Sequence, residues 1–141
     1  MKPTILLVDD EPMMQLLLKQ LFKAEFDVHV FNNGKEALNW MYSGSIPDLA
    51  IFDLQMPEMN GFDLVKLIQS GRLNRNTPVI FISAVYFDDS SIFKGYKTGA
   101  VDYIVKPVNL KILESKVKVF LQLERARLEL EVAKNEAFKA K

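Results

Sequence analysis

The sequence predicts an α/β protein, with a doubly wound sheet of five parallel strands and an extended C-terminal helix. Five short apolar runs alternate along the chain with segments whose apolar residues recur at helical spacing. Most of these runs are apolar on consecutive residues, which is typical of strands that helices cover on both faces. The chain has 141 residues, 49% of them hydrophobic, and this is enough to bury the core of one such domain.

The predicted strands are the runs at residues 4–8, 27–31, 48–52, 78–83 and 101–105. The second run, DVHVF, differs from the others because its apolar and polar residues alternate. We therefore expect this strand at an edge of the sheet, with His29 turned to solvent.

The predicted helices lie between and after these strands, at residues 12–24, 34–41, 61–69, 88–99 and 109–141. Two of them begin with the spacing of a capping box. Asn33 is followed by Glu36, and Asn60 is followed by Asp63. In each pair the first side chain can accept a main-chain N–H of the first helical turn, which favours a helix start at that point.

The last predicted helix contains neither Pro nor Gly. Its apolar residues form two seven-residue series that together make an a/d-like stripe: Ile112, Val119, Ala126, Ala133 and Ala140, with Leu123, Leu130 and Ala137. Lys116 interrupts this stripe, and Leu121, Leu128 and Val132 lie off it. The pattern fits a coiled coil and a solvated tail equally well. We divide the chain into a domain of residues 1–121 and a helical extension of residues 122–141.

The composition excludes several classes of protein. Eighteen basic and eighteen acidic residues cancel, so we expect neither nucleic acid nor a membrane surface as a direct partner. The chain has no cysteine, and therefore no disulfide framework and no thiolate metal site. The first apolar run is too short for a signal peptide, and no run is long enough to cross a membrane. The expected location is the cytoplasm.

Polar side chains stand at the ends of four predicted strands. Asp9 and Asp10 follow the first strand and Asp53 follows the third. Ser83 ends the fourth strand and Lys106 follows the fifth. The carboxyl ends of parallel strands share one edge of the sheet, so these five side chains should converge there.

This set of residues suits phosphoryl transfer. Clustered Asp oxygens are hard ligands, and Mg²⁺ binds one or two carboxylates together with water and phosphate oxygens. Lys106 can pair with a phosphoryl oxygen and Ser83 can donate a hydrogen bond to one, which leaves Asp53 as the nucleophile of an acyl phosphate. Glu11, next to the Asp pair, is expected in the first turn of the helix and not among the ligands.

With these motifs the sequence resembles the receiver (REC) domain of bacterial two-component response regulators. The resemblance extends over about residues 3–120 and rests on four motifs: LLVDDE, DLQMPEMNGFDL around Asp53, ISA at Ser83, and GAVDYIVKP around Lys106. It implies a flavodoxin-like sheet with strand order 2-1-3-4-5. It also implies a phosphoacceptor switch of a two-component phosphorelay, and not an enzyme that acts on other substrates.

The resemblance also implies a role for each acidic residue. Asp53 would receive the phosphoryl group from a histidine kinase or a phosphotransfer protein. Asp10, Asp53 and the backbone carbonyl of Gln55 would bind Mg²⁺ directly, whereas Asp9 would act mostly through water. The lifetime of the acyl phosphate depends on positions that vary in the family, so the resemblance does not predict it.

The remaining residues of the set would carry the switch. Ser83 and Lys106 would bind the phosphoryl group, and the bond from Lys106 to Pro107 would be cis. Tyr103 would be an aromatic switch that turns inward as Ser83 moves toward the phosphate. The change would alter the fourth and fifth helices and would pass along the C-terminal helix.

The C-terminal helix is similar to the linkers that join receivers to a signalling domain, such as a histidine kinase, a diguanylate cyclase or a cyclic-di-GMP phosphodiesterase. We therefore expect the chain to be the receiver part of a larger regulator, which acts through an output domain or a partner protein. A homodimer through the fifth helix is a further expectation. The sequence names neither the cognate kinase nor the output.

Three other functions fit parts of the pattern. A Mg²⁺-dependent phosphohydrolase would also form an aspartyl phosphate, but such enzymes usually carry a second Asp where this chain has Gln55. A flavin-binding protein of the same fold would prefer amides and hydroxyls to an acidic sheet edge. A degenerate receiver that only binds partners would not need the complete set of five residues.

Overall fold

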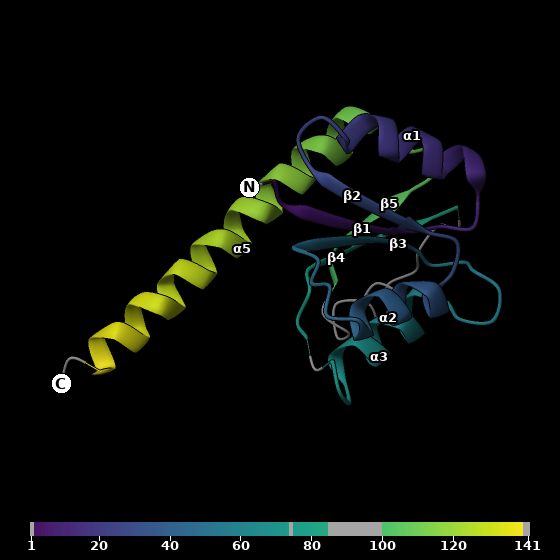
Figure 1. Cartoon of the computed structure of the whole chain (residues 1–141). Coiled ribbons are helices and arrows are strands. Elements are labelled where there is room, and N and C mark those ends of the chain that lie inside the picture. The colour runs from purple at the N-terminus through teal and green to yellow at the C-terminus, as the bar shows by residue number, and fades with distance from the viewer. Residues whose placement is uncertain (1, 74, 85–99, 140–141) are drawn as a thin grey trace.

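The computed structural model describes residues 2–73, 75–84 and 100–139. Its five parallel strands form one sheet in the order β2-β1-β3-β4-β5, which confirms the predicted fold class and strand order (Figure 1). The strands are β1 (Thr4–Val8), β2 (Asp27–Phe31), β3 (Leu49–Asp53), β4 (Val79–Ser83) and β5 (Ala100–Val105). The predictions for β1 and β2 match, and the others differ by one residue at one or both ends.

The helices are α1 (Pro12–Phe22), α2 (Gly34–Tyr42), α3 (Gly61–Gln69) and α5 (Leu110–Lys139). Both predicted caps are present. The Asn33 side chain accepts the N–H of Glu36 at 2.9 Å, and Asn60 forms a complete capping box with Asp63. The fourth predicted helix, residues 88–99, lies outside the described residues.

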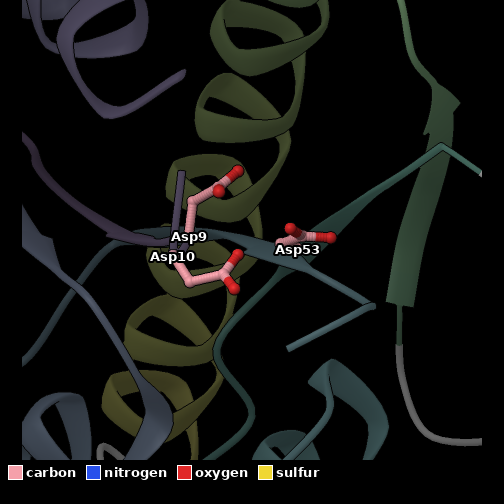
Figure 2. A group of neighbouring side chains, drawn as sticks. All are labelled: Asp9, Asp10 and Asp53. Atoms are coloured by element: carbon pink, nitrogen blue, oxygen red, sulfur yellow. The ribbon is translucent and has the colours of Figure 1, made fainter. Parts of the chain in front are cut away.

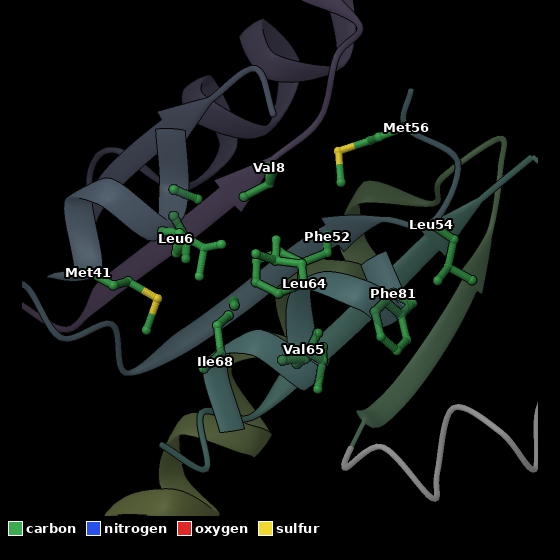
Figure 3. Close-up of a cluster of buried hydrophobic side chains, with 14 residues drawn as sticks. Leu6, Val8, Met41, Phe52, Leu54, Met56, Leu64, Val65, Ile68 and Phe81 are labelled. Atoms are coloured by element: carbon green, nitrogen blue, oxygen red, sulfur yellow. The ribbon is translucent and has the colours of Figure 1, made fainter. Parts of the chain in front are cut away.

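Two apolar layers hold the helices against the sheet. Ile5 and Leu7 belong to the layer shared with α1 and α5, whereas Leu6 and Val8 belong to the layer shared with α2 and α3. Figure 3 shows the second layer, in which side chains of α3 lie over those of the central strands. Because successive strand residues point to opposite faces, the central strands of a sheet with two covered faces are apolar at nearly every position.

Strand β2 lies at an edge of the sheet, as predicted, but the His29 side chain is only partly turned to solvent. The His29 ring is half-buried and lies 4.7 Å from the Trp40 ring of α2, measured between centroids. Its Nε2 atom is 3.1 Å from a carboxylate oxygen of Asp27. Although β2 is an edge strand, α2 covers one of its faces, and the imidazole ring packs against α2.

Helix α5 begins beside α1 and then leaves the domain (Figure 1). Leu113 and Val117 are buried, and Phe120 and Leu121 still pack against the core. Four large apolar side chains farther along the helix are exposed: Leu123, Leu128, Leu130 and Val132. The division of the chain at residue 121, and the choice between coiled coil and solvated tail, stay predictions.

None of the helices in the described part of the chain has the length and apolar character that crossing a membrane requires.

Candidate functional site

Three aspartates form an acidic cluster at the carboxyl edge of the sheet (Figure 2). Asp9 and Asp10 follow β1, and Asp53 ends β3, which pairs with β1 so that Val8 lies opposite Phe52. Each aspartate offers one carboxylate oxygen, and these three oxygens lie within 4.8 Å of one another. The cluster could therefore hold a metal ion.

Burial shapes the protonation of this cluster. Asp9 is 3% exposed and Asp53 is 4% exposed, whereas Asp10 is exposed. Burial raises the pKa of Asp9 from 3.8 to about 6, although the N–H of Glu11 donates to its Oδ1 at 2.8 Å and lowers it. Burial also raises the pKa of Asp53. The N–H of Gln55 donates to its Oδ1 at 3.0 Å and lowers the pKa, but by less than burial raises it. A bound cation would stabilise the ionised carboxylates, which burial disfavours.

Lys106 follows β5 and lies next to the cluster. Its Nζ atom is 3.5 Å from Asp53 Oδ2 and 3.9 Å from Asp9 Oδ2. Its shortest contact, however, is with Glu11 Oε2 at 2.7 Å. Burial lowers the pKa of Lys106, but the hydrogen bond to Glu11 and the charges of the three carboxylates outweigh it and raise the pKa overall. The lysine is therefore held in its charged form.

The prediction that Glu11 lies in the first turn of α1 is wrong. Glu11 occupies the N-cap position with an extended backbone, and the helix begins at Pro12. The Glu11 side chain makes no capping hydrogen bond and reaches Lys106 instead. Local sequence patterns carry no signal for this ion pair, because its partners are 95 positions apart.

The end of β4 lies next to the acidic cluster, because Ile82 pairs with Asp53. Ser83 is 1% exposed, and its carbonyl oxygen accepts the main-chain N–H of Lys106 at 2.8 Å. The side-chain oxygen of Gln55 accepts the N–H of Ala84 at 3.2 Å, which ties the loop after β3 to the end of β4. The bond from Lys106 to Pro107 is cis, as the resemblance implied.

Tyr103 lies on β5, three residues before Lys106. Its ring is half-buried, with its centroid 5.5 Å from that of the Phe81 ring on β4. The main-chain N–H of Tyr103 donates to Oδ1 of Asp102 at 2.7 Å. The proposed switch residue thus packs against the strand that carries Ser83, and its inward turn stays a prediction.

The loop between Asp53 and α3 is tightly folded. Glu58 has a φ of 69°, a conformation that residues other than Gly rarely adopt. Gly61, the first residue of α3, approaches so closely that a Cβ atom there would lie 3.1 Å from the Asp53 carbonyl oxygen. The Gly61 N–H donates to the Leu54 carbonyl oxygen at 3.3 Å, so the start of α3 lies directly against the end of β3.

Comparisons with known proteins agree on one family. A sequence profile described as "Response regulator receiver domain" matches residues 5–118. Regulatory protein AtoC of Escherichia coli (strain K12) is 35% identical over 127 residues, which cover 89% of this chain and 27% of that protein. The DNA-binding response regulator MtrA of Mycolicibacterium smegmatis is 32% identical over 123 residues, which cover 86% of this chain and 52% of MtrA.

Solved structures show the same likeness. The BeF3-activated DrrB receiver domain superposes with a TM-score of 0.75 at 30% identity, and the match covers 86% of this chain and 99% of that domain. The chain therefore spans nearly all of a solved receiver domain. It spans only 27% of AtoC and 52% of MtrA, the two curated relatives named above.

Proposed function

The chain belongs to the family of response regulator receiver domains, and we propose that it is a phosphoacceptor switch of a two-component phosphorelay. Members of this family are switches and not classical enzymes. In our proposal Asp53 receives the phosphoryl group of a phosphohistidine, carried by a histidine kinase or a phosphotransfer protein. The observation that supports this most is the convergence of Asp53 with Asp9, Asp10 and Lys106 at one sheet edge.

The proposed transfer needs little covalent machinery. A carboxylate oxygen of Asp53 attacks the phosphorus atom and the P–N bond to the histidine breaks. The electron pair of that bond stays on the imidazole nitrogen, which takes a proton from solvent. Lys106, 3.5 Å from Asp53, can offset charge on the phosphoryl oxygens, and we assign the Ser83 hydroxyl as a donor to one of them. The domain would catalyse only its own phosphorylation and dephosphorylation.

We also propose Mg²⁺ as the cofactor. The donor set fits this ion, because three hard carboxylate oxygens lie within 4.8 Å of one another. Asp10, Asp53 and the backbone carbonyl of Gln55 would hold the ion directly, and Asp9 would act mostly through water. When bound, the ion supplies positive charge against the phosphoryl oxygens.

Phosphate on Asp53 would then bias a two-state equilibrium. Strands β4 and β5 pair so that Phe81 lies opposite Tyr103, and the Ser83 position follows two residues later on β4. A movement at the end of β4 would therefore reach the packing of the Tyr103 ring. From there we propose that the change passes to the fourth predicted helix and to α5.

Helix α1 presents an apolar surface beside the acidic cluster. Met13, Leu16 and Leu17 lie on one helical face and are 66%, 55% and 41% exposed. We propose that the phosphodonor protein docks here, since exposed apolar patches mark protein interfaces. Leu16→Glu should slow transfer from a phosphohistidine protein but leave labelling by acetyl phosphate unchanged, because a small donor needs no docking surface.

The projecting part of α5 would connect the switch to its output. We propose that it leads to an output domain or a partner protein, and that it pairs two copies of the chain. The support is its run of exposed apolar side chains, which includes Leu123 and Leu130. The cytoplasmic location expected from the sequence belongs to the same proposal.

The Asp53→Asn variant tests the proposed function. It should abolish labelling by acetyl phosphate in the presence of Mg²⁺, measured by intact-protein mass spectrometry, because an amide offers no nucleophilic carboxylate. Asp27→Asn makes the same chemical change at the first residue of β2, which lies at the amino ends of the strands and away from the cluster. This control should be labelled like the wild type. Undiminished labelling of Asp53→Asn would contradict the assignment.

A further inference from the structure

Of the three carboxylates around the Lys106 ammonium group, that of Glu11 is the nearest, and it lies at the rim of the site. The Nζ–Oε2 distance is 2.7 Å, compared with 3.5 Å to Asp53 and 3.9 Å to Asp9. Lys106 is 16% exposed at its side chain, whereas Glu11 is 60% exposed. The lysine is thus held near the reacting carboxylate, but its hydrogen bond is directed to an acid that faces solvent.

Among the described residues, the Glu11 side chain has no hydrogen-bond or ion-pair partner other than Lys106. It makes no capping hydrogen bond to α1, and the main-chain N–H of Glu11 is taken by Asp9 at 2.8 Å. The Lys106 side chain differs, because it is mostly buried and its Nζ atom also lies 3.5 Å from Asp53 and 3.9 Å from Asp9. When the pair opens, the Glu11 side chain is therefore the partner that can swing into solvent, while Lys106 stays at the site.

We infer that Glu11 is a positioning residue that holds Lys106 at the rim of the site in competition with the phosphoryl group on Asp53. This inference rests on the proposed function. A phosphoryl group adds oxygens and negative charge beside Asp53, where Lys106 already lies within 3.5 Å. The ammonium group then turns from Glu11 to the phosphoryl oxygens, and Glu11 is repelled toward solvent. The Glu11–Lys106 pair therefore favours the unphosphorylated state.

Two substitutions separate this contact from the negative charge of Glu11. Glu11→Gln removes the charge and weakens the hold on Lys106. Glu11→Asp keeps the charge but shortens the side chain by one methylene group, so the 2.7 Å contact cannot form in the same place. A positioning role predicts that both variants release Lys106. If Glu11 acted only through its negative charge, Glu11→Gln alone would change ligand binding at the site.

The experiment is a calorimetric titration of the full chain with beryllofluoride, a phosphoryl analogue, at saturating Mg²⁺. We expect both variants to bind beryllofluoride about two- to fivefold more tightly than the wild type, the size that loss of one competing exposed ion pair allows. A second titration with Mg²⁺ alone should show weaker binding by both variants, because the released ammonium group turns toward Asp53 and Asp9. The loss should be larger for Glu11→Gln, which also lacks a negative charge.

Glu25→Gln is the matched control. Glu25 is also 60% exposed and also pairs with a lysine, Lys118, at 3.4 Å, but it lies beyond the other end of α1. The Glu25→Gln variant should bind beryllofluoride and Mg²⁺ with the affinities of the wild type. Tighter beryllofluoride binding by Glu11→Gln alone, or by neither Glu11 variant, would overturn the inference. A wild-type chain that binds no beryllofluoride with Mg²⁺ would overturn the proposed function itself.

Discussion

The ammonium group of Lys116 on α5 forms an ion pair with the carboxylate of Asp102 on β5. The same carboxylate accepts the main-chain N–H of Tyr103 at 2.7 Å, so one side chain connects the C-terminal helix to the proposed switch residue. Asp102 is 19% exposed and Lys116 is 37% exposed, which places the pair between a buried and a surface ion pair. The lysine that interrupts the apolar stripe of α5 therefore fastens that helix to the sheet.

Breaking this pair should lower the free energy of unfolding by about 1 kcal/mol. We expect this loss for Lys116→Gln and for Asp102→Asn. The double variant should lose less than the sum of the two, because both single changes remove the same interaction. Urea unfolding of the four proteins gives the coupling energy of the pair.

The control pair is Arg125–Glu129 on the projecting part of α5, whose side chains are 84% and 70% exposed. Its coupling energy should stay below about 0.5 kcal/mol, since exposed pairs within a helix contribute little. Equal coupling energies for the two pairs would show that the partial burial of Asp102 does not strengthen its ion pair with Lys116.

The Asp9→Asn variant should be more stable than the wild type at neutral and alkaline pH without Mg²⁺. The folded pKa of Asp9, about 6, lies above its ordinary value of 3.8, so ionised Asp9 opposes folding. The stability contributed by protonated Asp9 is complete below about pH 4 and is lost as the pH rises through 6. The two proteins should therefore converge near pH 4 and differ by roughly 2–3 kcal/mol at pH 8.

Urea unfolding in the presence of a chelator, between pH 4 and pH 8, measures this difference. Asn keeps an acceptor for the N–H of Glu11, so the comparison isolates the charge of Asp9. Asp27→Asn, at a side chain that is 59% exposed, should change stability little at any of these pH values. Saturating Mg²⁺ should reduce or reverse the advantage of Asp9→Asn, because the variant lacks one carboxylate of the proposed site.

Replacing Gly61 by Ala should destabilise the fold by about 1–2 kcal/mol. The added Cβ atom would lie 3.0 Å from the Phe81 ring and 3.1 Å from the Asp53 carbonyl oxygen. Phe81 is fully buried and the oxygen belongs to the main chain, so neither can move aside without cost. The expected loss exceeds the gain that Ala brings to the first turn of a helix.

Gly34→Ala is the matched control, because Gly34 is likewise the first residue of its helix. A Cβ atom there would meet the flexible side chain of Met59, which can rotate away. Thermal unfolding should therefore show a smaller loss for Gly34→Ala than for Gly61→Ala. A loss of the same size in both variants would contradict the role given to Phe81 and Asp53.

The projecting part of α5 should determine the oligomeric state. Leu123 and Leu130 are 59% and 57% exposed and lie seven residues apart on the apolar stripe. If two copies pair through this stripe, Leu123→Lys with Leu130→Lys should convert a dimer to a monomer in sedimentation experiments. Leu128→Lys, at an exposed position off the stripe, should leave the dimer intact. A monomeric wild type, with and without beryllofluoride, would favour the solvated tail.

Much of the fold follows from local sequence. The strand Thr4–Val8 is apolar and buried from Ile5 onward because the sheet has two covered faces, and α3 starts at Gly61 because Asn60 and Asp63 cap it. The convergence of Asp10, Asp53 and Lys106 could be predicted as well, because the carboxyl ends of parallel strands share one edge of a sheet.

The tertiary structure alone decided which partners the remaining charged and aromatic side chains have. Glu11 pairs with Lys106, and Lys116 pairs with Asp102, although each pair joins elements that are separate in the sequence. His29 packs on Trp40 for the same reason. Hydrophobic periodicity and capping are determined by neighbours within one or two helical turns. Ion pairs and ring contacts depend on the relative positions of whole elements, which the packing of the helices against the sheet sets.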